Sequence, residues 1–109
     1  SIKIFIYLLL QLEITIMLAI ILEGYIDIPS DRFDAVARVI PQYVQEMVAR
    51  LGCISFDIVP SPDIPHRFLA KGTFRDQVAV DAHFKPSKAS DWAKLTAGLP
   101  RIYMVSRTD

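Results

Sequence analysis

The chain has 109 residues, of which 52% are hydrophobic, and its 12 basic and 12 acidic residues give no net charge. This length fits one domain, and a balanced charge without a basic cluster argues against a nucleic-acid-binding surface. The single cysteine, Cys53, excludes an internal disulfide and fits a reducing compartment, so we expect a cytoplasmic protein.

Residues 1–16 form an apolar extension. Gln11, Glu13 and Thr15 alternate with Leu and Ile, which is the period of a half-buried strand. We therefore predict that Leu9–Thr15 adds a strand to a sheet edge or to a neighbouring subunit, with a terminal helix and a membrane anchor as alternatives. Membrane insertion is not expected, because a carboxylate in mid-span costs about 2.5–3.5 kcal/mol.

Residues 17–109 are predicted to form the folded module. A strand-like apolar run over 18–28 ends at a proline, and apolar residues from Phe33 to Leu51 then recur at spacings of three and four. That spacing predicts one buried face of a helix. Pro41 lies inside this helix, where it removes a backbone hydrogen bond, and therefore predicts a kink or a break.

The rest of the module alternates short strands and helices. Ile54, Phe56 and Ile58 are expected to share one face of their strand. The two strand–helix–strand halves predict a ferredoxin-like α+β fold of order βαββαβ, a four-stranded antiparallel sheet with helices on one face. The other face would be bare, so we expect a second copy to cover it in a homodimer. The predicted strands are 53–59, 66–74 and 101–107, and the predicted helices are 76–83 and 87–97.

Four short stretches occur in an order that is typical of one family: Gly52–Asp57, then Arg67–Leu69 after a proline-rich turn, Phe74–Asp76 and Val80–His83. From Met17 to Asp109 the chain resembles the antibiotic biosynthesis monooxygenase (ABM) family. The resemblance implies a dimeric α/β barrel-like assembly of ferredoxin-like subunits. The characterised members of the family include enzymes that oxygenate electron-rich aromatic or quinol substrates without a metal or prosthetic group. The chain also lacks glycine-rich phosphate loops and metal-ligand motifs, so we expect no cofactor and no metal.

The resemblance also points to candidate site residues. His83 falls at the family's recurring Ala-His and is the candidate catalytic base, because an imidazole titrates near ~6.5. Its alternative role is that of a helix-end histidine bonded to a backbone carbonyl. Phe74, Trp92, Tyr43 and Tyr103 are the expected substrate-binding residues of a pocket for a small apolar or aromatic molecule. Trp92 could instead anchor the core or the dimer.

Three positions depart from the family pattern. Phe74 stands where many relatives carry tryptophan, Gly72 where they often carry glutamate, and Lys88 or Ser87 where a second histidine is common. The chain also has no asparagine, which argues against the haem-degrading relatives.

We therefore expect a cofactor-independent monooxygenase that acts on a small aromatic or quinol-like substrate. One alternative is a non-catalytic dimeric ligand-binding or assembly module, in which residues 1–16 drive higher association. The other is a relative that degrades a small sugar-derived signal.

Overall fold

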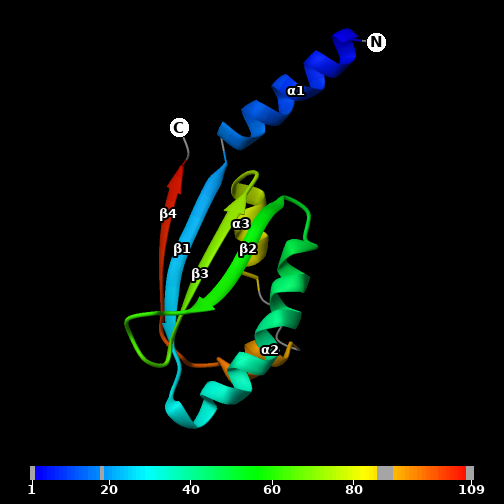
Figure 1. Cartoon of the computed structure of the whole chain (residues 1–109). Helices are drawn as coiled ribbons and strands as arrows, with labels where there is room; N and C mark the ends of the chain where they lie inside the picture. Colours follow the sequence, from blue (N-terminus) through cyan, green and yellow to red (C-terminus); the bar gives the residue numbers. More distant parts are fainter. Residues whose placement is uncertain (1, 18, 86–89, 108–109) are drawn as a thin grey trace.

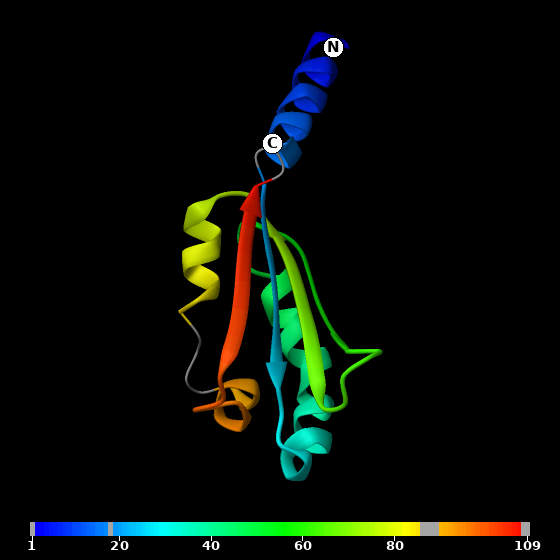
Figure 2. The same cartoon turned by 90° about the vertical axis from the view of Figure 1, so that its left-hand side faces the viewer.

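The computed structural model describes residues 2–17, 19–85 and 90–107. They form a four-stranded antiparallel sheet of order β2-β3-β1-β4, with helices packed on one face (Figures 1 and 2). This arrangement confirms the predicted ferredoxin-like α+β fold. The elements are α1 (Ile2–Met17), β1 (Ile20–Asp27), α2 (Ser30–Val48), β2 (Cys53–Pro60), β3 (Arg67–Phe74), α3 (Gln77–His83), α4 (Asp91–Leu95) and β4 (Arg101–Arg107).

Helix α2 buries one face against the sheet through Val36, Ile40 and Met47. Pro41 does not end the helix, which runs without interruption to Val48, so the predicted break is wrong. Figure 1 shows the axis of α2 bending along its length. The missing amide hydrogen costs one backbone bond, and the buried side chains before and after Pro41 hold both halves against the sheet.

The turn after α2 requires a glycine. Gly52 has a φ of 85°, and a Cβ there would lie 2.6 Å from the Cβ of Ala79 in α3. The amide of Arg75 donates a hydrogen bond of 2.7 Å to the carbonyl of Gly52. The absence of a side chain thus lets α3 pack closely against the start of β2.

Strand β2 departs from the predicted alternation at its first residues. A register shift between Cys53 and Ser55 marks a β-bulge, which puts one extra residue opposite β3. Phe56 and Ile58 are buried as a result, whereas Ile54 is 45% exposed. The prediction that Ile54 shares their face is therefore wrong, because the bulge reverses the side-chain alternation at that point.

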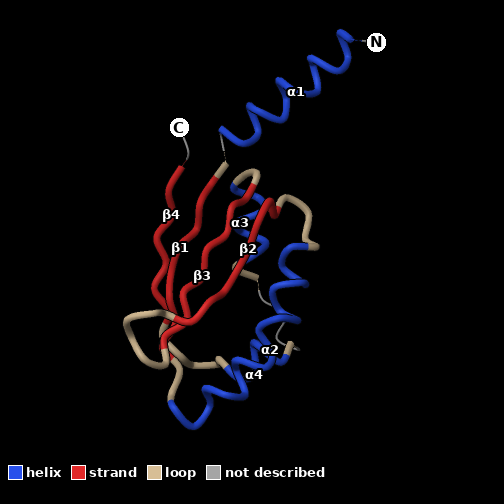
Figure 3. Tube along the Cα trace, viewed as in Figure 1, coloured by secondary structure: helices blue, strands red, loops and turns tan. Residues whose placement is uncertain are grey.

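Two short helices lie over the same face as α2, and α4 lies beside α2 (Figure 3). The carboxylate of Asp76 caps α3 by accepting a 3.0 Å hydrogen bond from the amide of Ala79. The hydroxyl of Ser90 caps α4 in the same way, from the amide of Ala93 at 3.1 Å. The helix predicted over 87–97 is thus shorter than expected, and the predicted start at Ser87 lies outside the described residues.

The opposite side of the sheet, here called the open face, carries no helix (Figure 2). Directly paired residues of neighbouring antiparallel strands point to the same side, so Tyr25 shares the open face with its partners Leu69 and Ile102. A bidentate ion pair between Arg67 and Asp27, with a shortest distance of 2.7 Å, lies there too. The exposed apolar side chains of this face are Val59 at 45%, Leu69 at 36%, Ile102 at 52% and Met104 at 70%.

The N-terminal extension is a helix, so the predicted strand over Leu9–Thr15 is wrong and the alternative of a terminal helix is correct. Helix α1 points away from the sheet (Figure 1), and its large apolar side chains from Ile2 to Leu12 are 46–75% exposed. A helix satisfies its backbone hydrogen bonds internally, whereas a strand needs a partner edge. Within the described residues, no helix has the length and apolarity needed to cross a membrane.

Candidate functional site

Six aromatic rings form a continuous arc between the sheet and the helices. Each ring contacts the next with centroids 4.7–5.9 Å apart. Such contacts hold the rings in fixed relative orientations. The members of this aromatic arc, in order, are Trp92, Tyr43, Phe56, His83, Phe84 and Tyr103.

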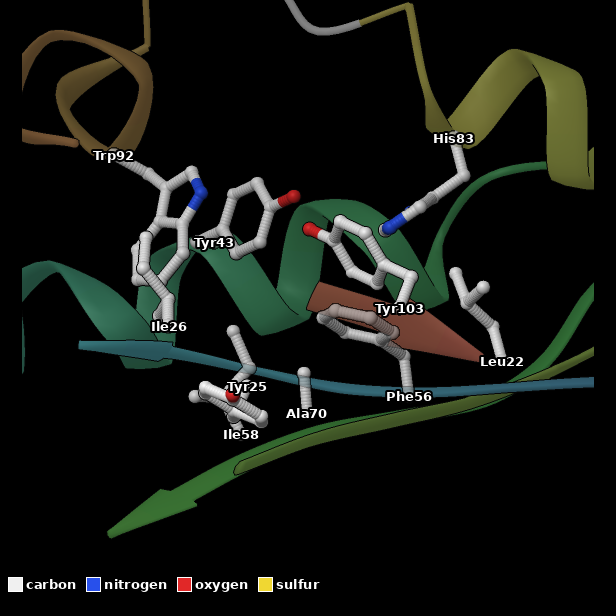
Figure 4. Close-up of a pocket in the computed structure, with 10 residues that line it drawn as sticks. All are labelled: Leu22, Tyr25, Ile26, Tyr43, Phe56, Ile58, Ala70, His83, Trp92 and Tyr103. Carbon is white, nitrogen blue, oxygen red and sulfur yellow. The ribbon is translucent and has the colours of Figure 1, made fainter. Parts of the chain in front are cut away.

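Two neighbouring cavities lie along the aromatic arc. The inner cavity has a volume of about 20 Å³ and is shown in Figure 4, while the outer cavity has a volume of about 540 Å³. Both are lined by Tyr43, His83, Trp92 and Tyr103, which therefore stand between them. These four side chains come from α2, α3, α4 and β4, so the site is assembled from elements far apart in the sequence.

Gly24 allows Tyr103 to lie over the sheet at this site. The two residues are directly paired between β1 and β4. A Cβ at Gly24 would lie 2.2 Å from the carbonyl oxygen of Ile102 and 2.8 Å from the Tyr103 ring. A glycine inside a strand often marks such a close approach.

Gly72 has a similar role beneath His83. A Cβ at this position would lie 2.7 Å from the Phe74 ring and 2.9 Å from the Phe56 ring. Both rings also contact the imidazole of His83, with centroids 5.3 and 5.2 Å away. Gly72 therefore leaves room for an apolar floor under His83.

His83 ends α3 and is only 8% exposed. Burial, together with the positive charge of Arg50, lowers the pKa of His83 to about 4, so the imidazole is neutral at pH 7. Among the described residues, none forms a hydrogen bond with its buried Nδ1. The guanidinium of Arg50 donates instead to the carbonyl of Ala82, at 2.9 Å. The alternative role, a histidine that bonds a backbone carbonyl, is therefore not observed at Nδ1.

Two tyrosine hydroxyls point into the space that His83 faces. Figure 4 shows the hydroxyls of Tyr43 and Tyr103 turned toward one another beside the imidazole. Burial raises the pKa of Tyr43 to about 12, and Tyr103 contributes to the shift. Tyr43 is therefore a neutral phenol at physiological pH, able to donate a hydrogen bond to a ligand oxygen.

The structure brings four of the five predicted site residues together and separates the fifth. Tyr43, His83, Trp92 and Tyr103 line both cavities, and Trp92 stacks on Tyr43 at 4.7 Å rather than facing the open side of the sheet. Phe74 is 2% exposed and lines neither cavity. It supports His83 from behind.

Sequence reasoning missed several residues of the site. Phe56 and Phe84 complete the aromatic arc, and Arg101 lines the outer cavity. Phe84 directly follows the Ala-His pair, and Gly24 interrupts an apolar strand, so both left a signal in the sequence. Arg101 left none, because the cavity that it lines is formed together with residues from distant parts of the chain.

No group of three or more His, Cys, Asp or Glu side chains that could hold a metal ion occurs in the part of the chain that the structure describes. The residues that line the cavities instead suit a planar organic molecule. They offer aromatic faces, two hydroxyl groups and one neutral imidazole.

Comparison with known proteins identifies the family. A family profile described as "Antibiotic biosynthesis monooxygenase" matches residues 19–95. The chain therefore belongs to the ABM family, as the sequence stretches predicted. The matched region begins beside β1, and so excludes the whole of α1. A search of curated proteins found no match.

Solved structures share the fold at low sequence identity. A candidate antibiotic biosynthesis monooxygenase from Nitrosomonas europaea is 20% identical, with a TM-score of 0.71 over 82% of this chain and 88% of that chain. One from Deinococcus radiodurans is 12% identical, with a TM-score of 0.70 over 81% and 90%. A conserved protein from Bacteroides thetaiotaomicron, described as a possible oxidoreductase of unknown function, is 14% identical, with a TM-score of 0.67 over 84% and 98%.

Proposed function

We propose that this protein is a cofactor-independent monooxygenase for a small aromatic or quinol-like substrate. Family membership supports an oxygenase in general terms. The observation that carries the proposal is the buried, neutral imidazole of His83, whose Nδ1 lacks a partner among the described residues, beside an aromatic cavity of about 540 Å³. A cavity of this size accommodates a small planar ligand.

In this proposal, His83 removes a proton from the substrate, and the resulting carbanion or phenolate supplies electrons to dioxygen. For an anthrone, a ring CH₂ becomes a carbonyl. One atom of O₂ enters the product, and the other leaves as water with the two hydrogens. The substrate provides all four electrons, so the balance needs no further reductant.

The tyrosines would bind the substrate oxygen on which negative charge develops. Tyr43 and Tyr103 present hydroxyl donors in a low-dielectric site, where a hydrogen bond to an anionic oxygen is strengthened. The inner cavity, of about 20 Å³, has room for one water-sized molecule. Its mostly apolar lining suits dioxygen better than water.

Oxygen-electrode assays with anthrones and substituted hydroquinones test the proposal. The wild-type chain is expected to accelerate oxygen uptake above the no-protein rate, and His83→Gln to lose most of that acceleration, about 10²-fold or more for a general base. His66→Asn is the matched control, since His66 lies in a turn at a φ of 63°, which asparagine tolerates. Uptake equal to the no-protein rate, or unchanged in His83→Gln, would contradict the proposal.

A non-catalytic ligand-binding module on the same fold is the second candidate. It is favoured by the low pKa of His83, since a group with a pKa of about 4 is a weak base at pH 7. Calorimetric binding of the same compounds without oxygen uptake would select this candidate.

We also propose a homodimer through the open face. Its exposed apolar side chains flank a hollow of about 470 Å³, which is lined by Tyr25, Leu69 and Met104 together with the charged Glu23, Asp57 and Lys71. Exposed apolar side chains gathered on one face are typical of association sites on soluble proteins.

A further inference from the structure

The outer cavity is positively charged at its rim. Two of its lining side chains, Lys94 and Arg101, are cationic, and no described lining residue is acidic. An apolar cavity that keeps two cations at its rim is electrostatically complementary to an anionic ligand.

Arg101 is held in place by a chain of hydrogen bonds. Its Nη2 donates to the carbonyl oxygen of Thr96 at 3.0 Å and to Thr96 Oγ1 at 2.6 Å. Thr96 is fully buried, and its hydroxyl donates in turn to the carbonyl of Trp92 at 2.7 Å. The guanidinium is thereby coupled to the helical turn that carries Trp92, whose indole forms one wall of the cavity.

This arrangement leaves part of the guanidinium for a ligand. Only Nη2 takes part in the bonds to Thr96. Within the described chain, no carboxylate lies within 4.0 Å of Arg101. A guanidinium fixed at one nitrogen, with further N–H donors in the same plane, can bind a carboxylate in a planar geometry.

We infer that the outer cavity selects a planar aromatic acid, in which an aryl ring carries a carboxylate. The ring lies against the stacked Trp92 and Tyr43, and the carboxylate pairs with Arg101, with Lys94 adding to the positive field. This inference rests on the proposed function, because it names the substrate class of the same cavity. The pairing also sets the orientation of the ring relative to His83.

A matched pair of ligands tests the inference. Anthraquinone-2-carboxylate and anthraquinone-2-carboxamide differ in charge but hardly in shape. Isothermal titration calorimetry is expected to give the carboxylate at least about tenfold higher affinity, the range of one charge-assisted hydrogen bond. Trp92 is the only tryptophan of the chain, so quenching of its fluorescence reports binding at this cavity.

Variants of Arg101 attribute the preference to its charge. Arg101→Gln is expected to bring the two affinities within about twofold of each other, whereas Arg101→Lys keeps part of the preference. Arg107→Gln is the matched control, because Arg107 lies on the same strand and the same side as Arg101 but lines neither cavity. It is expected to leave the preference unchanged.

Thr96→Val tests whether the hydrogen-bond chain positions Arg101. The valine keeps the shape of the side chain and removes Oγ1. Affinity for the carboxylate is expected to fall severalfold, while affinity for the carboxamide stays the same. A merely structural role of Thr96 would lower both affinities together.

The inference is overturned if the wild-type chain binds both ligands equally, if neither ligand quenches Trp92, or if Arg101→Gln retains the full preference. Its failure is distinguishable from failure of the proposed function. If the chain prefers the carboxylate but no substrate gives oxygen uptake, the proposed oxygenase activity is contradicted and the inference about the aromatic acid is supported. If neutral hydroquinones give oxygen uptake but the chain shows no preference for the acid, the inference is contradicted and the oxygenase activity is supported.

Discussion

His83 combines two properties that are rarely found together in a side chain with only a structural role. It is buried among phenylalanine rings, and its Nδ1 lacks a hydrogen bond within the described part of the chain. An unsatisfied buried polar group costs about 1–3 kcal/mol of stability. A ligand that donates a proton or a hydrogen bond to this nitrogen would recover that energy on binding.

The pH dependence of turnover follows from the lowered pKa of His83. The neutral imidazole is the active base, and burial favours it down to about pH 4. We therefore expect the acid limb of kcat/KM to inflect below 6.5, toward about 4, in oxygen-uptake assays at constant ionic strength. An inflection at 6.5 or above would show that the acting base is another group or is solvated. Measuring substrate ionisation separately provides the control.

Three glycine-to-alanine variants separate steric from backbone effects. At Gly24 a Cβ would meet backbone atoms of β4, which cannot rotate away, whereas at Gly72 it would meet only side-chain rings. Overpacking lowers the free energy of unfolding by about 1–3 kcal/mol. We expect the loss for Gly24→Ala to lie within or above this range, and the loss for Gly72→Ala to lie near its lower end. Urea unfolding measures both.

Gly98→Ala is the control for these variants, because its Cβ would meet nothing within 4 Å but its φ of 77° is unfavourable for alanine. We expect Gly98→Ala to lower the free energy of unfolding by about 1–2 kcal/mol. If Gly24→Ala is no more costly than Gly98→Ala, then β4 is not held as closely over Gly24 as described.

At the scale of elements, the module was predictable and α1 was not. Most strands and helices of residues 19–85 and 90–107 follow from periodicity, prolines and caps such as Asp76, all of which are local signals. In the extension, leucine and isoleucine fit a helix and a strand equally well. The choice depends on whether a partner edge exists, which no local pattern contains. The bulge between Cys53 and Ser55 escaped prediction for a related reason, since it depends on pairing with β3.

The candidate site was predictable only in part. Family resemblance and residue type identified His83, Tyr43, Trp92 and Tyr103, which do converge. The bond between Arg101 and Thr96 depends on how β4 returns past α4, and sequence spacing does not reveal it.

Deleting residues 1–17 tests the independence of α1. Because this helix points away from the sheet, we expect the variant to keep the thermal midpoint and the Trp92 fluorescence of the full chain within error. Its exposed apolar surface predicts that the full chain self-associates more strongly in sedimentation experiments. A loss of several degrees in the midpoint would show instead that α1 contributes to the core.

At the scale of the whole molecule, the open face is the main surface without a helix. We expect Leu69→Glu, which places a charge among its apolar side chains, to shift the proposed dimer toward monomers in sedimentation velocity. Val78→Glu is the matched control, because Val78 is 76% exposed on α3, on the other side of the sheet. Sedimentation of the wild type as a monomer at micromolar concentration would contradict the proposed dimer.

Strand β4 lies at the sheet edge, hydrogen-bonded to β1 alone, and its side chains are all exposed. Yet this strand supplies both Arg101 and Tyr103 to the cavities. Any neighbour that binds along this edge would restrict the fraying of β4 and so fix both groups. By mass action, ligand affinity would then rise with protein concentration, and the ligand would in turn tighten self-association by the same factor.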